Sequence, residues 1–130
     1  MREGDLPSVA ALLLDCNLVL ERGLSDRLHH LLRTSPNCCV VALEDDQLVG
    51  VALAVFNGFH IFMSHIAVSP EHRGRGIGRA MHEELERIAR RINASGILTD
   101  SWLGVTGFYH ALGYRIPGAV FLVRDIRRDP

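Results

Sequence analysis

The stretch His65–Asn93, HIAVSPEHRGRGIGRAMHEELERIARRIN, holds the features around which the rest of the chain is organised. Its first residues are mostly apolar and include β-branched side chains, and Pro70 follows them, which predicts a strand that ends at the proline. A loop rich in arginine and glycine comes next, and apolar residues recur at helical spacing from Ile77 onward. The order of strand, glycine-rich loop and helix is typical of an anion site at a helix N-terminus.

The backbone explains why this loop suits an anion. The first N–H groups of a helix have no intrahelical acceptor, and the aligned peptide dipoles add partial positive charge there. Glycine has no Cβ to block the approach of a phosphate, and arginine adds guanidinium charge. The segment that supplies these groups, called the phosphate loop below, is Arg73, Gly74, Arg75, Gly76, Ile77, Gly78 and Arg79. We therefore expect it to bind a pyrophosphate.

Other phosphate-binding loops fit less well. A Walker loop needs a lysine after its last glycine, and the chain contains no lysine. The dinucleotide fingerprint G-x-G-x-x-G would need glycine at position 79, which is Arg79. A turn that only joins a strand to a helix would leave three loop arginines without a role.

Two motifs carry a family resemblance. Arg73-x-x-Gly76-x-Gly78, preceded by Ile66-Ala67-Val68-x-Pro70, resembles the acyl-CoA signature of the GNAT family of N-acetyltransferases. Phe108-Tyr109-x-x-x-Gly113-Tyr114 resembles the later FYxxxGF element of the same family. The resemblance spans nearly the whole chain and implies an α/β fold, with a mixed, mostly antiparallel central sheet that carries helices on both faces.

The resemblance also implies a reaction, the transfer of an acetyl group from the cosubstrate acetyl-CoA to a primary amine of a small molecule or a peptide. The backbone of Ile66, Ala67 and Val68 would align the pantetheine arm and the acyl carbonyl. Tyr109 would protonate the departing thiolate, since a phenol has a pKa of about 10, close enough to that of a thiol. A packed aromatic is the alternative for Tyr109, and a CoA-binding sensor module without turnover is the alternative function.

The group that accepts the amine proton is left open by the sequence. His65 adjoins the residues that would align the cosubstrate, but strand alternation puts it on the opposite face from Ser64 and Ile66 unless a bulge intervenes. Asp100 ends the next strand, near the point where the two strands should splay. An ordered water chain is the third candidate. The histidine and cysteine spacings match no metal-site motif, so we expect no metal.

Composition limits the remaining possibilities. The 130 residues, 48% of them apolar, suit one domain over residues 1–130. A formal net charge of −1 argues against non-specific nucleic-acid binding. Three cysteines and the absence of a long apolar run predict a cytoplasmic protein without a disulfide framework, a signal peptide or a membrane span. The sequence does not determine the oligomeric state, and a homodimer is one option.

Local patterns predict the order of elements. A helix is expected from Leu6 to Leu20, after an Asp5 cap, and a second from a Ser25 or Asp26 cap to the residues before Pro36. Strands are then expected at Cys38–Leu43, Leu48–Phe56, His60–Val68, Ile97–Ser101 and Ala119–Ile126, and helices at Ile77–Ile92 and Val105–Leu112, with Gly113 as the stop of the second helix and 127–130 frayed. On the helix Ile77–Ile92, His82 is expected outside the apolar face. Glu83 with Arg87 and Glu86 with Arg90 are expected as ion pairs that support this helix. The first two strands are apolar on both faces, which predicts central strands. The family's usual first strand is expected to be short or missing, because little chain precedes the first helix.

Overall fold

The computed structural model describes residues 1–101, 106–118, 122–124 and 126. The chain divides into two compact units, Met1–Thr99 and Asp100–Pro130. The first unit contains η1 (Glu3–Asp5), α1 (Leu6–Asp15), α2 (Leu24–Thr34), β1 (Val40–Glu44), β2 (Gln47–Phe56), β3 (His60–Val68), η2 (Pro70–His72), α3 (Ile77–Arg91) and β4 (Gly96–Thr99). The second contains α4 (Gly107–Ala111). One domain over residues 1–130 stays a prediction.

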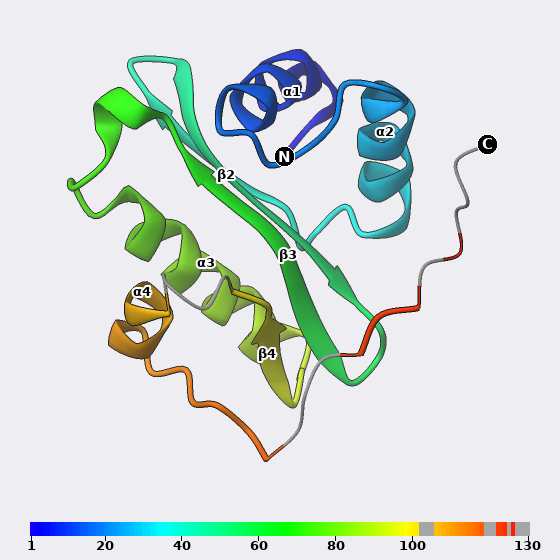
Figure 1. Cartoon of the computed structure of the whole chain (residues 1–130), viewed down its shortest axis with the longest axis vertical. Coiled ribbons are helices and arrows are strands. Elements are labelled where there is room, and N and C mark those ends of the chain that lie inside the picture. The colour runs from blue at the N-terminus through cyan, green and yellow to red at the C-terminus, as the bar shows by residue number, and fades with distance from the viewer. Residues whose placement is uncertain (102–105, 119–121, 125, 127–130) are drawn as a thin grey trace. The chain divides into compact units, whose positions relative to one another are not determined.

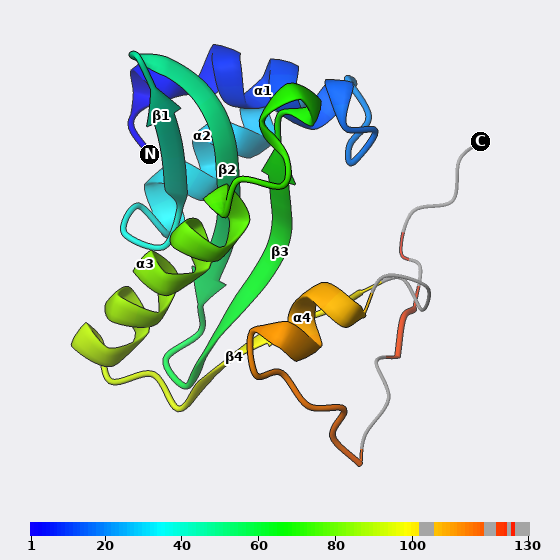
Figure 2. The same ribbon diagram turned by 90° about the vertical axis from the view of Figure 1, so that its left-hand side faces the viewer.

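The first unit is built on one mixed sheet in the order β1-β2-β3-β4. Strands β1, β2 and β3 are antiparallel neighbours, and β4 runs parallel to β3 after the crossover through α3. Figures 1 and 2 show α1 and α2 on one face of this sheet and α3 on the other. The predicted fold class is confirmed.

The hairpin between β1 and β2 turns through two residues, Asp45 and Asp46, whose φ angles of 49° and 62° are left-handed. Such a two-residue turn matches the twist of the flanking strands. Strand β2 is buried on both faces from Val49 to Ala54, as a central strand should be. The prediction that β1 is also central is wrong, because β1 is the edge of the described sheet and its last two residues are exposed.

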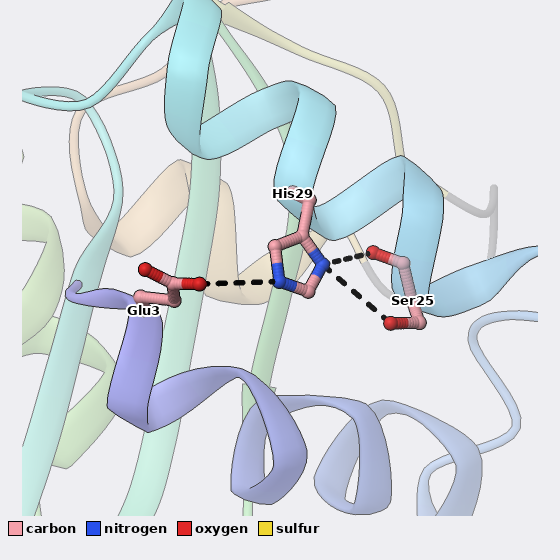
Figure 3. Close-up of polar contacts among 3 residues, drawn as sticks. All are labelled: Glu3, Ser25 and His29. Carbon is pink, nitrogen blue, oxygen red and sulfur yellow. Dashed lines mark hydrogen bonds and ion pairs between the residues drawn. The ribbon is translucent and has the colours of Figure 1, made fainter.

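A buried core joins α1 and α2 to one face of the sheet. Its members are Leu6, Val9, Leu12, Leu13, Leu24, Leu28, Cys39, Val51, Leu53 and Ala67. His29 of α2 adds a polar link, since its Nδ1 lies 2.8 Å from the Ser25 carbonyl and its Nε2 lies 3.8 Å from Oε1 of Glu3 (Figure 3). The amino group of Met1 donates to the Cys39 carbonyl at 3.1 Å. The first element of the described chain is thus the short helix η1 and not a strand. Glu3 of η1 contacts α2, and Met1 contacts the residue before β1.

The ends of the first two helices differ from the prediction. Helix α1 ends at Asp15, not Leu20, because Asn17 adopts a left-handed φ of 56° and Leu18 N donates back to Leu13 O at 3.1 Å. Helix α2 begins at Leu24 after a left-handed Gly23 with a φ of 71°, so neither Ser25 nor Asp26 is its N-cap. A single residue in the left-handed region sets both boundaries, against the apolar spacing in α1 and against the expected side-chain cap in α2.

Helix α3 presents Met81, Leu85 and Ile88 to the other face of the sheet, as their spacing predicts. A Cβ on Gly50 of β2 would lie 3.0 Å from the Met81 side chain, so this glycine allows the helix to approach closely. His82 was expected outside this face, but it is only 2% exposed. Its burial lowers the pKa of the imidazole, against the opposing influence of Glu86.

Charged pairs on the outer side of α3 follow the prediction only in part. Arg90 Nη2 pairs with Glu86 Oε2 at 3.3 Å, as expected. Arg87 pairs with Glu84 at 2.8 Å, so the expected pair of Arg87 with Glu83 is wrong. Residues three and four positions apart are both neighbours on a helix surface, and Arg87 pairs with the glutamate three positions before it.

In the second unit, α4 ends before Gly113, which has a φ of 91° and acts as the predicted stop. The predicted helix start at Val105 and residues 119–121, 125 and 127–130 lie outside the described residues. Residues 122–124 and 126 carry no strand assignment. The expected last strand therefore stays a prediction.

Candidate functional site

Strand β3 contains a bulge beside the predicted site. Leu53 of β2 pairs with His65, but the next residue, Ala54, pairs with Met63, so Ser64 is the extra residue. A bulge of this kind bends its strand and changes which face each later side chain occupies. Since paired residues share a face, His65 lies on the α1 and α2 face with Leu53.

The bulge brings two neighbouring polar side chains together. His65 Nδ1 lies 2.8 Å from Ser64 Oγ, and Ser64 Oγ donates to the Leu53 carbonyl at 3.3 Å. Side chains of consecutive residues in a regular strand point to opposite faces and could not meet in this way. The bulge thus brings His65 to the Ser64 side chain, whereas His65 and Ile66, paired in regular register with Leu53 and Ala52, still point to opposite faces.

The ladder between β3 and β4 ends at the same place. It joins His60–Met63 to Gly96–Thr99, and Thr99 Oγ1 donates to the Met63 carbonyl at 3.0 Å. Within the described part of the chain, β3 therefore continues for five residues beyond its last β4 partner. An extended ligand could add to this edge of β3 as a further strand does.

The register shows which backbone groups face that edge. Ser69 N donates to Val49 O at 2.8 Å, and in an antiparallel ladder bonded and non-bonded pairs alternate. Ala67 is then bonded to Val51 of β2, whereas the N–H and C=O groups of Ile66 and Val68 point away from β2. The predicted alignment of pantetheine by Ile66, Ala67 and Val68 would therefore use the N–H and C=O groups of Ile66 and the N–H of Val68, since the Val68 carbonyl accepts from Arg73 Nε.

The phosphate loop leads from this edge into α3. Gly74 and Gly76 have φ angles of 78° and 81°, and a Cβ at either position would meet no atom within 4 Å. Their backbone conformation requires glycine, and the space above them is open. Gly76 is the N-cap of α3, and the first intrahelical bond runs from Ala80 N to Gly76 O at 3.0 Å. The N–H groups of Ile77 and Gly78 thus have no intrahelical acceptor.

Arg73 is held at the start of the loop. Its Nε donates to the Val68 carbonyl at 3.1 Å, and its Nη2 lies 3.5 Å from Sγ of Cys16 at the end of α1. Cys16 Sγ itself lies 3.8 Å from the same Val68 carbonyl. The guanidinium is therefore fixed beside the last residue of β3.

A carboxylate from β1 also holds the loop. Glu44 Oε2 lies 3.1 Å from His72 Nε2, and Glu44 Oε1 lies 3.6 Å from Arg75 Nη1. Both side chains of the second pair are about half exposed, so the pair is weakened by solvent and is open to exchange for another anion. Sequence reasoning missed four residues: Glu44, Cys16, His72 and Ser64. Glu44 and Cys16 are far from the loop in sequence and reach it only through tertiary contacts. His72 and Ser64 adjoin the loop and His65 in sequence, but their contacts depend on the fold.

A separate cavity of about 520 Å³ lies between α1 and the β1–β2 hairpin. Asp15, Asp45 and Asp46 contribute to its lining, together with Ser8 and Ser69. Three carboxylates make it a poor site for a pyrophosphate. The phosphate loop, with its arginines and helix N-terminus, is the better anion site.

Two predicted catalytic residues belong to the second unit. Asp100 is its first residue and is exposed. Tyr109 lies in α4, where its ring makes edge-to-face contacts with Phe108 at 5.2 Å and Tyr114 at 5.6 Å between centroids. The roles of Asp100 and Tyr109 stay predictions.

The described residues contain neither a metal-ligand cluster nor a helix that could span a membrane. Among them, no three His, Cys, Asp or Glu side chains form a group that could hold a metal ion. None of the described helices has the length and apolar character needed to cross a bilayer. All three cysteines are free thiols, and burial raises the pKa of Cys38 and Cys39.

Comparison with known proteins decides the family. The model of the acetyltransferase (GNAT) family matches residues 6–114, which include β3, the phosphate loop and α4. The chain belongs to the GNAT family. GNAT members are acetyltransferases by the description of that family, which confirms the predicted resemblance.

The individual relatives share low sequence identity with this chain. Human N-acetyltransferase 8B is 26% identical over 114 residues, which cover 81% of this chain and 50% of that protein. The chain thus spans half the length of this curated relative. Aminoglycoside N-acetyltransferase AAC(6')-Iy in complex with CoA has a TM-score of 0.80 at 18% identity, over 98% of this chain and 92% of the other. Ribosomal-protein-alanine N-acetyltransferase from Brucella melitensis has a TM-score of 0.76 at 21% identity, over 96% of this chain and 95% of the other.

Proposed function

We propose that this GNAT chain transfers an acetyl group from acetyl-CoA to a primary amine of a small molecule or a protein. The observation that carries the proposal is the junction of β3 with α3. There, the edge of β3 at Ile66 and the Val68 N–H, beyond its last described β4 partner, leads directly to the glycine-rich N-terminus of a helix. A pantetheine arm along the edge and a pyrophosphate at the helix would use both features at once.

The reaction requires two proton transfers around one bond exchange. The neutral amine nitrogen attacks the thioester carbonyl carbon, a C–N bond forms and the C–S bond breaks. A base takes the proton of the amine, and an acid gives a proton to the departing thiolate. We assign the acid to Tyr109.

For the base we favour His65 over Asp100 and over water. The bulge at Ser64 brings His65 together with a hydroxyl that can orient its ring, and His65 directly precedes Ile66, whose backbone groups face the strand edge. If replacement of His65 leaves the acidic limb of the kcat/KM profile in pH unchanged, the base is Asp100 or a water chain.

Thiol release from acetyl-CoA in the presence of an amine panel tests the proposal. The panel contains an aminoglycoside, a peptide with an N-terminal alanine and a polyamine, because two of the structural neighbours act on the first two kinds of acceptor by name. We expect release that depends on at least one amine. Binding of acetyl-CoA without release for any amine would favour the sensor module instead. The cytoplasmic location and the homodimer stay predictions.

A further inference from the structure

The hydroxyl of Ser64 has only one hydrogen, and the Leu53 carbonyl is placed to accept it. Ser64 Oγ lies 3.3 Å from the Leu53 carbonyl oxygen, which can only accept a hydrogen bond. The hydroxyl therefore donates to Leu53. Its remaining hydrogen-bonding capacity consists of oxygen lone pairs.

This assignment determines the state of the neighbouring imidazole. His65 Nδ1 lies 2.8 Å from the same oxygen. With the hydroxyl hydrogen directed to Leu53, only lone pairs are left there, so Nδ1 is the donor in this arrangement. A neutral ring that carries its hydrogen on Nδ1 has its lone pair on Nε2. The proton that the ring gains and loses is then the proton on Nε2.

We propose that Ser64 is a positioning residue, which holds His65 in the Nδ1–H tautomer so that Nε2 is the nitrogen that accepts the amine proton. The use of Nε2 in catalysis rests on the proposed acetyl transfer, whereas the tautomer does not. An acceptor on one ring nitrogen is a general means of orienting a histidine base through the other.

The β3 bulge makes this arrangement available. Because Ser64 is the extra residue between the pairs Leu53–His65 and Ala54–Met63, its side chain can reach both the Leu53 carbonyl and the next residue. The bulge thus bends β3 where its ladder with β4 ends and also supplies the acceptor for His65.

Nitrogen NMR of the histidine side chains tests the tautomer without any substrate. The chain has seven histidines, so the His65 signals are assigned as those absent from His65→Gln. Above the titration range we expect Nδ1 of His65 to carry hydrogen and Nε2 to carry none. Ser64→Ala should move the ring toward the other tautomer, Ser64→Thr should retain the wild-type state, and the exposed Ser95→Ala should have no effect.

Kinetics test the use of that nitrogen. Ser64→Ala should lower kcat by about tenfold, the ratio that corresponds to one ordinary hydrogen bond, with the KM for acetyl-CoA unchanged. Ser64→Thr should restore most of the loss. A rise in KM that accounts for the whole effect would overturn the positioning role.

The wild-type spectrum decides the tautomer even if Ser64→Ala fails to fold. Hydrogen on Nε2 of neutral wild-type His65, or an unchanged ring in a folded Ser64→Ala, would overturn the inference. A wild type that keeps the Nδ1–H tautomer but shows no acetyl transfer would instead overturn the proposed function.

Discussion

Replacement of Gly76 by glutamate should abolish acetyl-CoA binding. Gly76 is the N-cap of α3 with a φ of 81° and open space around it, so the new carboxylate would occupy the place proposed for the pyrophosphate. At about 4 Å and an effective dielectric constant of about 20, each pair of like charges costs about 4 kcal/mol. This corresponds to a loss of affinity of about a thousandfold.

Thermal unfolding with and without acetyl-CoA measures this loss. At a ligand concentration of about 100 Kd, binding stabilises the folded wild type by about 2.7 kcal/mol. With about 4 °C per kcal/mol for a chain of this size, Tm should rise by about 10 °C. The same concentration is about 0.1 Kd for Gly76→Glu, so its Tm should not move.

Gly58→Glu is the matched control. Gly58 lies in the turn before β3, at the opposite end of that strand from the loop, and it also has a left-handed φ, of 96°, with open space around it. Both variants should lose about 1–3 kcal/mol of stability from backbone strain. Only Gly76→Glu should lose the ligand-induced shift, and a full shift in that variant would refute the binding of pyrophosphate at the phosphate loop.

Three further predictions concern proton transfer and stability. Tyr109→Phe should lower kcat and leave the Kd for acetyl-CoA nearly unchanged in calorimetry, since the role proposed for the hydroxyl concerns only the leaving thiolate; an equal loss of affinity would point to packing. His65→Gln should flatten the acidic limb of the kcat/KM profile while Asp100→Asn retains it; the reverse result would make Asp100 the base, and a limb kept in both would favour water. Because the folded-state pKa of His82 is lowered, its contribution to stability is complete above the unfolded-state value of about 6.5 and falls as the pH drops below it. Melting curves between pH 7.5 and 5 should show that loss in the wild type and a smaller loss in His82→Leu, and identical pH dependence would contradict it.

Much of the fold could be predicted from local patterns. Strand β3 has the predicted bounds, His60–Val68, because Asn57-Gly58 and Pro70 mark both of its ends. Helix α3 was recognisable from its apolar spacing, and the phosphate loop from its glycines and arginines. Left-handed residues set two helix boundaries that were predicted wrongly: Asn17 contradicts the apolar spacing at the end of α1, and Gly23 replaces the expected side-chain cap at the start of α2.

The details of the site depend on register and tertiary contacts, which local patterns do not contain. Ser64 is an ordinary strand residue in the sequence, and only the pairing of β2 with β3 makes it a bulge. His82 is polar, yet the packing of α3 buries it. The contact of Glu44 with Arg75 joins segments that no sequence motif connects.

Transfer of a labelled acetyl group tests the central claim most directly. Acetyl-CoA carrying ¹³C at the acetyl carbonyl is incubated with the protein and the best amine of the panel, and the carbonyl signal is followed by NMR. We predict that the thioester signal disappears as an amide signal of equal size appears, and that the Gly76→Glu variant gives neither change. A thioester signal that persists at full intensity with the folded wild type, across the whole amine panel, would contradict the assignment of this chain as an N-acetyltransferase.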